Sequence, residues 1–204
     1  MPRPRRAAIG ALWRLDATLG AVLVTGTDPL LSRIRLAWWR DALEKLDRAP
    51  APAEPVLRAL ADHVLPAGVA GAELAELEQG WTAIVPGEPL TGETLALYAG
   101  RRGGALFALS ARLLGGAADP VEAGGRAWAL VDLARHSSRR AEAEAALRAA
   151  AETSIGGRWP RPLRAIGMLA LLAQRDARRG LDRLERFGAP LRMWRMIAHR
   201  LSGR

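Results

Sequence analysis

The chain has 204 residues, enough for one domain with a buried core, and it contains no cysteine, which excludes disulfides, thiolate nucleophiles and cysteine-ligated metals. Its formal charge is +9, almost all of it from arginine, since Lys45 is the only lysine. This balance is compatible with diphosphate or anionic lipid as a partner, whereas the short basic runs and the few aromatic residues argue against a surface for nucleic acid.

Helix-forming residues dominate the composition and β-branched residues are sparse, so we predict an all-α fold in a single domain over residues 1–204. The first helix is expected from Arg5 to Val24. Arg14 and Asp16 interrupt the apolar run that a signal peptide would need, and no segment has 18 uncharged apolar residues. We therefore expect a cytoplasmic protein, for which peripheral contact with a membrane is compatible with the charge.

The second predicted helix lies within DPLLSRIRLAWWRDALEKLD, from Asp28 to Asp47. Asp28 is a good N-cap, and Pro29 occupies the first helical position, where its missing N–H costs nothing. Apolar residues recur at helical spacing and predict one broad face that buries both tryptophans in the core. The residues of this face are Leu30, Leu31, Ile34, Trp38, Trp39 and Leu43.

Part of this helix resembles the squalene/phytoene synthase family, whose members carry an R-L-x-W-W-R-[DE]-A-L run. The matching residues are Arg35, Leu36 and the stretch from Trp38 to Leu43. The resemblance implies a shortened isoprenoid-synthase-like helical bundle. It also implies an ancestral activity in which two prenyl diphosphates are joined head to head with the help of Mg²⁺.

Two shorter helices are predicted at Val56–Val64 and Ala70–Ile84, and a longer one from Thr91 to Gly115. The longer helix contains two adjacent glycines, Gly103 and Gly104, and each costs about 1 kcal/mol relative to alanine in a helix interior. They indicate either a kink or close helix crossing, or a place where a ligand approaches the backbone. The resemblance favours a ligand, because the family places a Tyr and a glycine-containing turn at the substrate cavity; Tyr98 and Gly103 match them.

Asp119 and Pro120 repeat the N-cap signal and begin a helix that is predicted to pass Leu133 and extend to Ala151. The remaining helices are expected at Pro162–Arg179, Leu181–Phe187 and Pro190–Leu201.

The family holds Mg²⁺ with two D-x-x-x-D motifs, each of which places two carboxylates on one helix face. In this sequence no Asp or Glu has an acidic residue four positions later. The first motif position corresponds to Asp16. In the second motif Asp132 replaces an Asn, and His136 and Arg140 replace the two Asp residues. Arg135 is kept, and it could contact an anion without a metal.

These substitutions favour a family member that has lost prenyl transfer and acts as a non-enzymatic scaffold or assembly factor, like degenerate relatives that include an assembly factor of respiratory complex I. On this hypothesis no cofactor is expected. Its partners would be respiratory-chain assembly proteins or a lipid-like ligand. Two alternatives stay open: an active prenyltransferase with an unrecognised Mg²⁺ site, and a basic helical module that binds anionic lipid or nucleic acid.

Overall fold

The computed structural model describes residues 3–87, 89–185 and 188–203. Within these ranges the chain forms helices and no β-strand, as the composition predicted. The α-helices are α1 (Arg3–Thr25), α2 (Pro29–Lys45), α3 (Pro55–His63), α4 (Gly71–Thr82), α5 (Gly92–Tyr98), α6 (Ala105–Leu114), α7 (Pro120–His136), α8 (Arg140–Glu152), α9 (Arg164–Arg179) and α10 (Pro190–Ser202). Short 3-10 turns lie at Leu65–Ala67, Arg161–Leu163 and Leu181–Arg183, and a π-helical turn, η2, lies at Ala99–Gly104.

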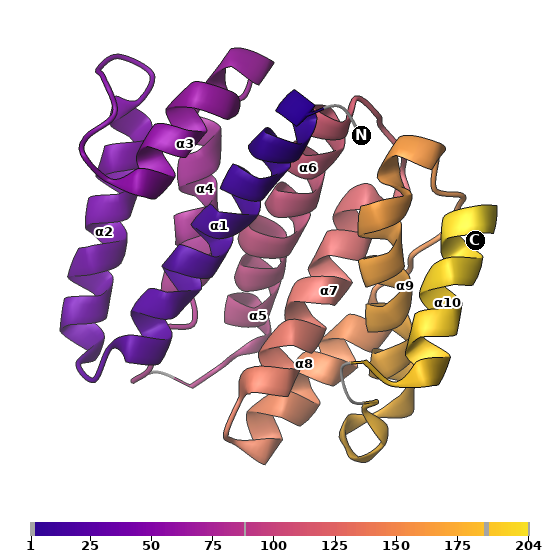
Figure 1. Ribbon diagram of the computed structural model, residues 1–204. Helices are drawn as coiled ribbons and strands as arrows, with labels where there is room; N and C mark the ends of the chain where they lie inside the picture. The colour runs from indigo at the N-terminus through magenta and orange to yellow at the C-terminus, as the bar shows by residue number, and fades with distance from the viewer. Residues whose placement is uncertain (1–2, 88, 186–187, 204) are drawn as a thin grey trace.

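The helices form a bundle in which the chain proceeds from one side to the other (Figure 1). Helix α1 packs against α3 and α6, while α2 packs against α4 at one edge. Helix α7 is central, because it contacts η2, α6, α8 and α9. Helix α10 packs on α9 at the opposite edge.

Helix α1 supplies much of the core. Its buried residues include Leu12, Leu15 and Leu19, all with no exposed surface. Among the described helices it is also the one whose length and hydropathy would suffice to cross a membrane; its apolar stretch, Pro4–Thr25, has a mean hydropathy of 1.5 and is 44% buried in the fold. Since the inner face of α1 lies in the protein core, these properties are also those of a buried helix.

Helix α2 begins as predicted, because the Asp28 carboxylate accepts a hydrogen bond of 2.8 Å from the backbone N–H of Leu30. The prediction for its apolar face is only partly correct. Trp39 is buried together with Leu36 and Leu43, whereas Trp38 is 50% exposed. The apolar stripe is broader than the contact with α4, so the row formed by Leu30, Leu31, Ile34 and Trp38 remains on the surface.

The predicted helix from Thr91 to Gly115 is present as three consecutive segments, α5, η2 and α6. The Thr91 hydroxyl caps its start by accepting from the Thr94 N–H at 3.2 Å. At the end of η2 the Ala105 N–H reaches back to the Gly100 carbonyl, which is the i to i−5 bond of a π-helix.

The helix that starts after Asp119 is shorter than predicted. Asp119 makes no side-chain capping bond, and α7 ends at His136 instead of continuing to Ala151. The break occurs at Ser137, where the Ser137 hydroxyl accepts from the Arg139 N–H at 3.2 Å and so competes with helical hydrogen bonding. Of the helix predicted at Leu181–Phe187, only the 3-10 turn Leu181–Arg183 forms, and residues 186 and 187 lie outside the described residues.

Candidate functional site

A buried arginine joins the two acidic positions that the sequence singled out. Arg102, in η2, is 4% exposed. Its Nε and Nη2 donate to the two carboxylate oxygens of Asp16 in α1, at 2.9 and 3.0 Å. Its Nη1 donates to Oδ2 of Asp132 in α7 at 2.8 Å and to the Tyr98 hydroxyl oxygen. One guanidinium therefore links α1, α5 and α7.

Aromatic rings enclose the same guanidinium. Its central carbon lies 4.1 Å from the ring centroid of Trp81 and 4.7 Å from that of Trp128. The Trp81 indole N–H donates to Oδ1 of Asp16 at 3.0 Å, so this carboxylate accepts three hydrogen bonds. Cation–π contact stabilises a desolvated arginine, which helps to offset the cost of burying it.

Burial has different effects on the two titrating groups at the centre. It raises the pKa of the Tyr98 hydroxyl far above the usual value of 10.0, so the hydroxyl stays protonated at neutral pH. Burial by itself would lower the pKa of Arg102, but the neighbouring oxygens of Tyr98, Asp16 and Asp132 outweigh it and raise that pKa. The arginine is therefore a permanent cation in this site.

A cleft of about 940 Å³ opens above this group of residues. Asp16, Arg102, Asp132 and Tyr98 line its inner part, and its other walls come mainly from apolar residues of α1 and from the segment between α4 and α5. His136 and Arg139 lie among the lining residues at the end of α7 and beyond it. The cleft thus has an apolar wall and a charged, internally paired floor, a shape suited to a ligand that is largely apolar.

Four of the seven predicted site residues meet at the cleft. Asp16, Asp132 and Tyr98 all contact Arg102, and the Nδ1 atom of His136 lies 3.4 Å from Oδ1 of Asp132. The side chain of His136 is 67% exposed.

The other three predicted residues lie elsewhere. Arg140 is on the surface, where it pairs with Glu144 at 2.8 Å and Asp182 at 3.0 Å. Arg135 donates to the buried Asp176 of α9 at 2.6 Å. Gly103 is at a close crossing of η2 and α7: a Cβ at this position would stand 2.1 Å from the carbonyl oxygen of Gly125. This geometry corresponds to the close-crossing interpretation of the two glycines.

The residues at the cleft do not fit a magnesium ion. The carboxylate oxygens of Asp16 already accept from Arg102 and Trp81, and a fixed guanidinium occupies the space between Asp16 and Asp132. In the part of the chain that the structure describes, no group of three or more His, Cys, Asp or Glu side chains is arranged to hold a metal. A hard dication needs free oxygen ligands, and here Arg102 and Trp81 use both carboxylate oxygens of Asp16, while Arg102 also uses Oδ2 of Asp132.

Arg102 and Trp81 were not among the predicted site residues. A signal for Arg102 was present, because it lies in a row of otherwise uncharged buried positions at helical spacing: Leu95, Tyr98, Arg102, Leu106 and Leu109. A charge inside such a row indicates a buried ion pair. Trp81 has no comparable signal, because its partner Asp16 is 65 residues away in the sequence.

Comparisons with known proteins agree with this architecture. The model of the squalene/phytoene synthase family matches residues 1–149. Nothing matches significantly among curated proteins or among solved structures. The match covers most of the chain, from α1 into α8, and includes α2 with Trp38 and Trp39, Arg102, and the acidic positions Asp16 and Asp132. The fold is therefore the all-α isoprenoid-synthase-like bundle, and the chain belongs to the squalene/phytoene synthase family.

Proposed function

We propose that this protein is a non-enzymatic family member in which an internal arginine replaces the metal and diphosphate, and that it serves as a cytoplasmic scaffold or assembly factor whose cleft holds a lipid-like ligand. Respiratory-chain assembly proteins are its partners on this proposal. The observation that carries the proposal is the Arg102 guanidinium between Asp16 and Asp132.

The chemistry of prenyl transfer explains why this arginine matters. Ionising a prenyl diphosphate separates an allylic cation from a diphosphate anion, and the anion must be stabilised by metal ions and basic groups. Here the carboxylates that would face the metal, Asp16 and Asp132, already pair with the Arg102 guanidinium. Freeing them would break a buried, bidentate ion pair, which costs several kcal/mol.

An enzyme assay tests the loss of catalysis. Purified protein is incubated with farnesyl or geranylgeranyl diphosphate and Mg²⁺, and diphosphate release and prenyl products are measured by mass spectrometry beside an active family synthase. We expect no turnover. Turnover that disappears in D16N or D132N would show an active prenyltransferase, the alternative that the size of the cleft favours.

A binding assay tests retention of the ligand. Farnesol, which has the apolar chain without the diphosphate, should raise the melting temperature of the wild-type protein. Ala21→Trp should abolish the rise, because Ala21 is an exposed residue that lines the cleft. Ala72→Trp is the matched control, since Ala72 is equally an exposed helix residue but lies outside the cleft. An equal response of wild type and Ala21→Trp would refute ligand binding in the cleft.

A further inference from the structure

The net positive charge of the protein comes entirely from its C-terminal quarter. Residues 1–152 contain 18 basic and 18 acidic residues, whereas residues 153–204 contain 12 arginines and three acidic residues. The whole formal charge of +9 therefore lies in the segment that includes α9 and α10, beyond the residues that match the family. This separation of charge is independent of the cleft.

Helix α10 has its amphipathic faces reversed relative to an ordinary surface helix. Its inward face is polar: Arg192 donates to the buried Asp176 at 2.8 Å, Arg195 donates to Glu185 at 2.9 Å, and His199 is 1% exposed. Its outward face is apolar and consists of Leu191, Met193, Trp194, Ile197 and Leu201. Trp194 is 68% exposed and Leu201 is 76% exposed. Ion pairs hold the helix in place, and its hydrophobic residues remain available for another surface.

The acidic residues of this segment are used in those internal contacts. Asp176 accepts from Arg135 as well as from Arg192, and Glu185 pairs with Arg179 and Arg195. The third, Asp182, pairs with Arg140 of α8. Glu185 also lies 3.9 Å from Arg175, and three carboxylates can balance the charge of at most three of the 12 arginines, so the segment keeps a net positive charge.

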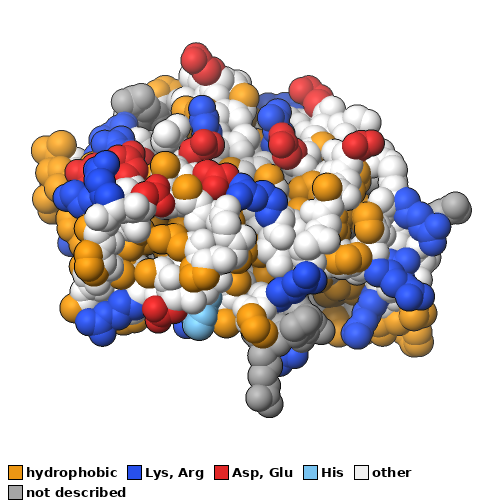
Figure 2. Space-filling view, turned by 90° about the horizontal axis from the view of Figure 1, so that it is seen from above, with side chains coloured by type: hydrophobic (Ala, Val, Ile, Leu, Met, Phe, Trp, Pro, Cys, Tyr) orange, Lys and Arg blue, Asp and Glu red, His pale blue; other side chains and the backbone are white. Residues whose placement is uncertain are grey.

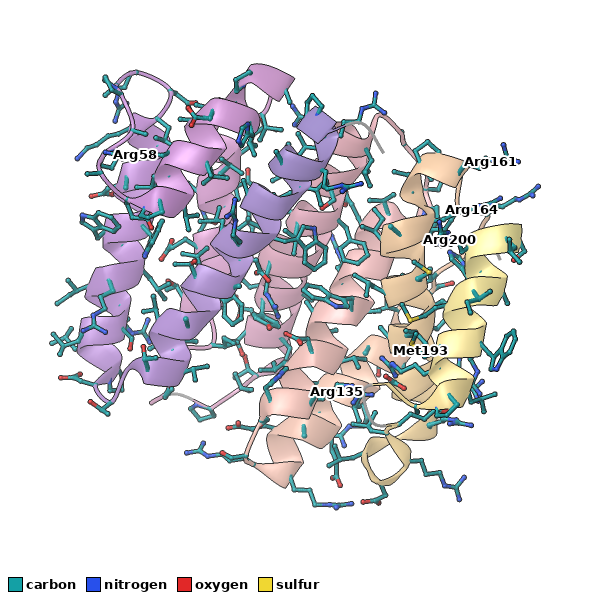
Figure 3. The ribbon with its side chains drawn as sticks, viewed as in Figure 1. Arg58, Arg135, Arg161, Arg164, Met193 and Arg200 are labelled. Carbon is teal, nitrogen blue, oxygen red and sulfur yellow. The ribbon has the colours of Figure 1, made fainter. Side chains whose placement is uncertain are left out.

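Three of those arginines gather at the C-terminal end of α10. Arg161, Arg164 and Arg200 lie together there, and Nη1 of Arg164 donates to the carbonyl oxygens of Arg200 and Leu201 at 2.8 Å (Figure 3). In the view from above, hydrophobic side chains and arginines lie side by side along the edge that α9 and α10 form (Figure 2). An apolar stripe and a cationic cluster thus share one edge of the molecule.

We propose that α10, with Arg161, Arg164 and Arg200, is a docking surface for an anionic lipid bilayer. A helix of 13 residues is about 20 Å long, too short to cross the hydrocarbon layer, so it would lie in the membrane surface. Trp194 and the aliphatic side chains would enter the boundary between headgroups and acyl chains, and the arginines would contact lipid phosphates. The exposed apolar face of α10 and the net positive charge of this segment are complementary to the surface of an anionic bilayer.

Vesicle flotation tests this surface with the full chain. Wild-type protein should float with vesicles of phosphatidylcholine that contain roughly 30% phosphatidylglycerol and stay unbound with pure phosphatidylcholine. Binding should fall at least about tenfold when the salt is raised to about 0.5 M, because screening weakens attraction to the charged surface. Flotation that does not depend on anionic lipid would contradict the proposal, as would the absence of flotation.

Substitutions locate the contact. The double variant W194S/I197S should lose about tenfold or more of the binding, since two exposed apolar side chains are removed. The control L30S/W38S removes two similarly exposed residues from α2, at 65% and 50% exposure, and should bind like the wild type. R161Q/R200Q should weaken binding severalfold, whereas R58Q/R126Q, which removes two exposed arginines of the charge-balanced part, should change it little.

The same variants distinguish the other occupants of this surface. Sedimentation velocity without lipid reports self-association. A dimer that W194S/I197S dissociates, combined with no vesicle binding, would mean that a second copy covers α10 and would overturn the proposal. Equal losses from L30S/W38S and W194S/I197S would overturn it as well, because binding would then follow general exposed hydrophobicity.

Discussion

Replacing Arg102 by Met should destabilise the protein strongly, because the substitution keeps a long side chain and removes the charge. Arg102 and Asp16 are each 4% exposed, so the substitution leaves an uncompensated carboxylate in the interior. Removing one partner of a buried ion pair costs about 3 to 5 kcal/mol. For a domain of this size that loss corresponds to a melting temperature lower by about 6 to 20 °C.

Urea unfolding followed by far-ultraviolet circular dichroism measures the change, as a lower midpoint at an unchanged slope. Arg101→Met is the matched control: Arg101 is the neighbouring residue of η2, its side chain is 44% exposed, and its pair with Glu76 is on the surface. Such pairs contribute less than about 1 kcal/mol. Similar losses of stability in R102M and R101M would contradict a destabilising effect of the unpaired buried carboxylate.

A double-mutant cycle assigns the loss to the ion pair rather than to altered packing. D16N removes the partner charge. The loss of unfolding free energy in R102M/D16N should therefore be about 1 to 3 kcal/mol smaller than the sum of the losses in R102M and D16N. Additive losses within about 0.5 kcal/mol would show that Arg102 acts through its contacts with Trp81 and Trp128 instead.

Two further outcomes follow from the helix contacts. Gly103→Ala should cost about 1 to 3 kcal/mol or more in urea unfolding, because the new methyl group meets the Gly125 carbonyl, whereas Gly100→Ala in the same turn meets nothing within 4 Å and should not destabilise. The pKa of Glu185 is lowered, chiefly by the hydrogen bond from Arg195, so Glu185 stabilises the fold above pH 4.5 and this stabilisation is lost as the pH falls through its lowered pKa. The difference in unfolding free energy between wild type and E185Q should therefore be constant above pH 4.5 and shrink below it, and a difference that grows in acid would contradict this sign.

Local signals predicted several helix starts correctly. The Asp28 and Pro29 pair and the Thr91 cap define helix starts through bonds within a few residues, so the sequence contains the necessary information. Periodicity identified the apolar stripe of α2 but not its burial, since burial depends on which elements cover it. Trp38 and Trp39 illustrate the difference: they are adjacent in sequence, yet one is exposed and one is buried.

The candidate site was predictable only in part, because its contacts also depend on which elements pack together. Motif comparison identified Asp16 and Asp132 as positions in the two degenerate metal motifs and Tyr98 as a match to a family element at the substrate cavity. The guanidinium between them depends on pairs that are 86 and 30 residues apart in the sequence, and no local pattern specifies such pairs. Arg102 could have been recognised as a charge in an apolar row, but its pairing with Asp16 and Asp132 could not.

The π-helical turn explains how one arginine reaches both carboxylates. A π turn inserts an extra residue into the helix and so changes the direction in which the following side chains point. Glycines let neighbouring helices approach the turn from two sides. A Cβ at Gly80 of α4 would stand 2.6 Å from the backbone nitrogen of Arg102, and a Cβ at Gly103 would stand 2.1 Å from the carbonyl oxygen of Gly125 in α7. With no side chains in the way, the turn is clamped between α4 and α7.

Because the turn is held between α4 and α7, the charges of Asp16 and Asp132 are balanced by a residue of the chain itself, Arg102, and not by a bound ion. A metal held by free carboxylates exchanges with solvent and leaves with its diphosphate, so its binding energy is available to each catalytic cycle. A guanidinium attached to a clamped backbone cannot leave, and its attraction to Asp16 and Asp132 contributes to folding instead. On the proposed function, the arrangement that stabilises these carboxylates without a ligand is also the one that keeps them from binding a catalytic metal.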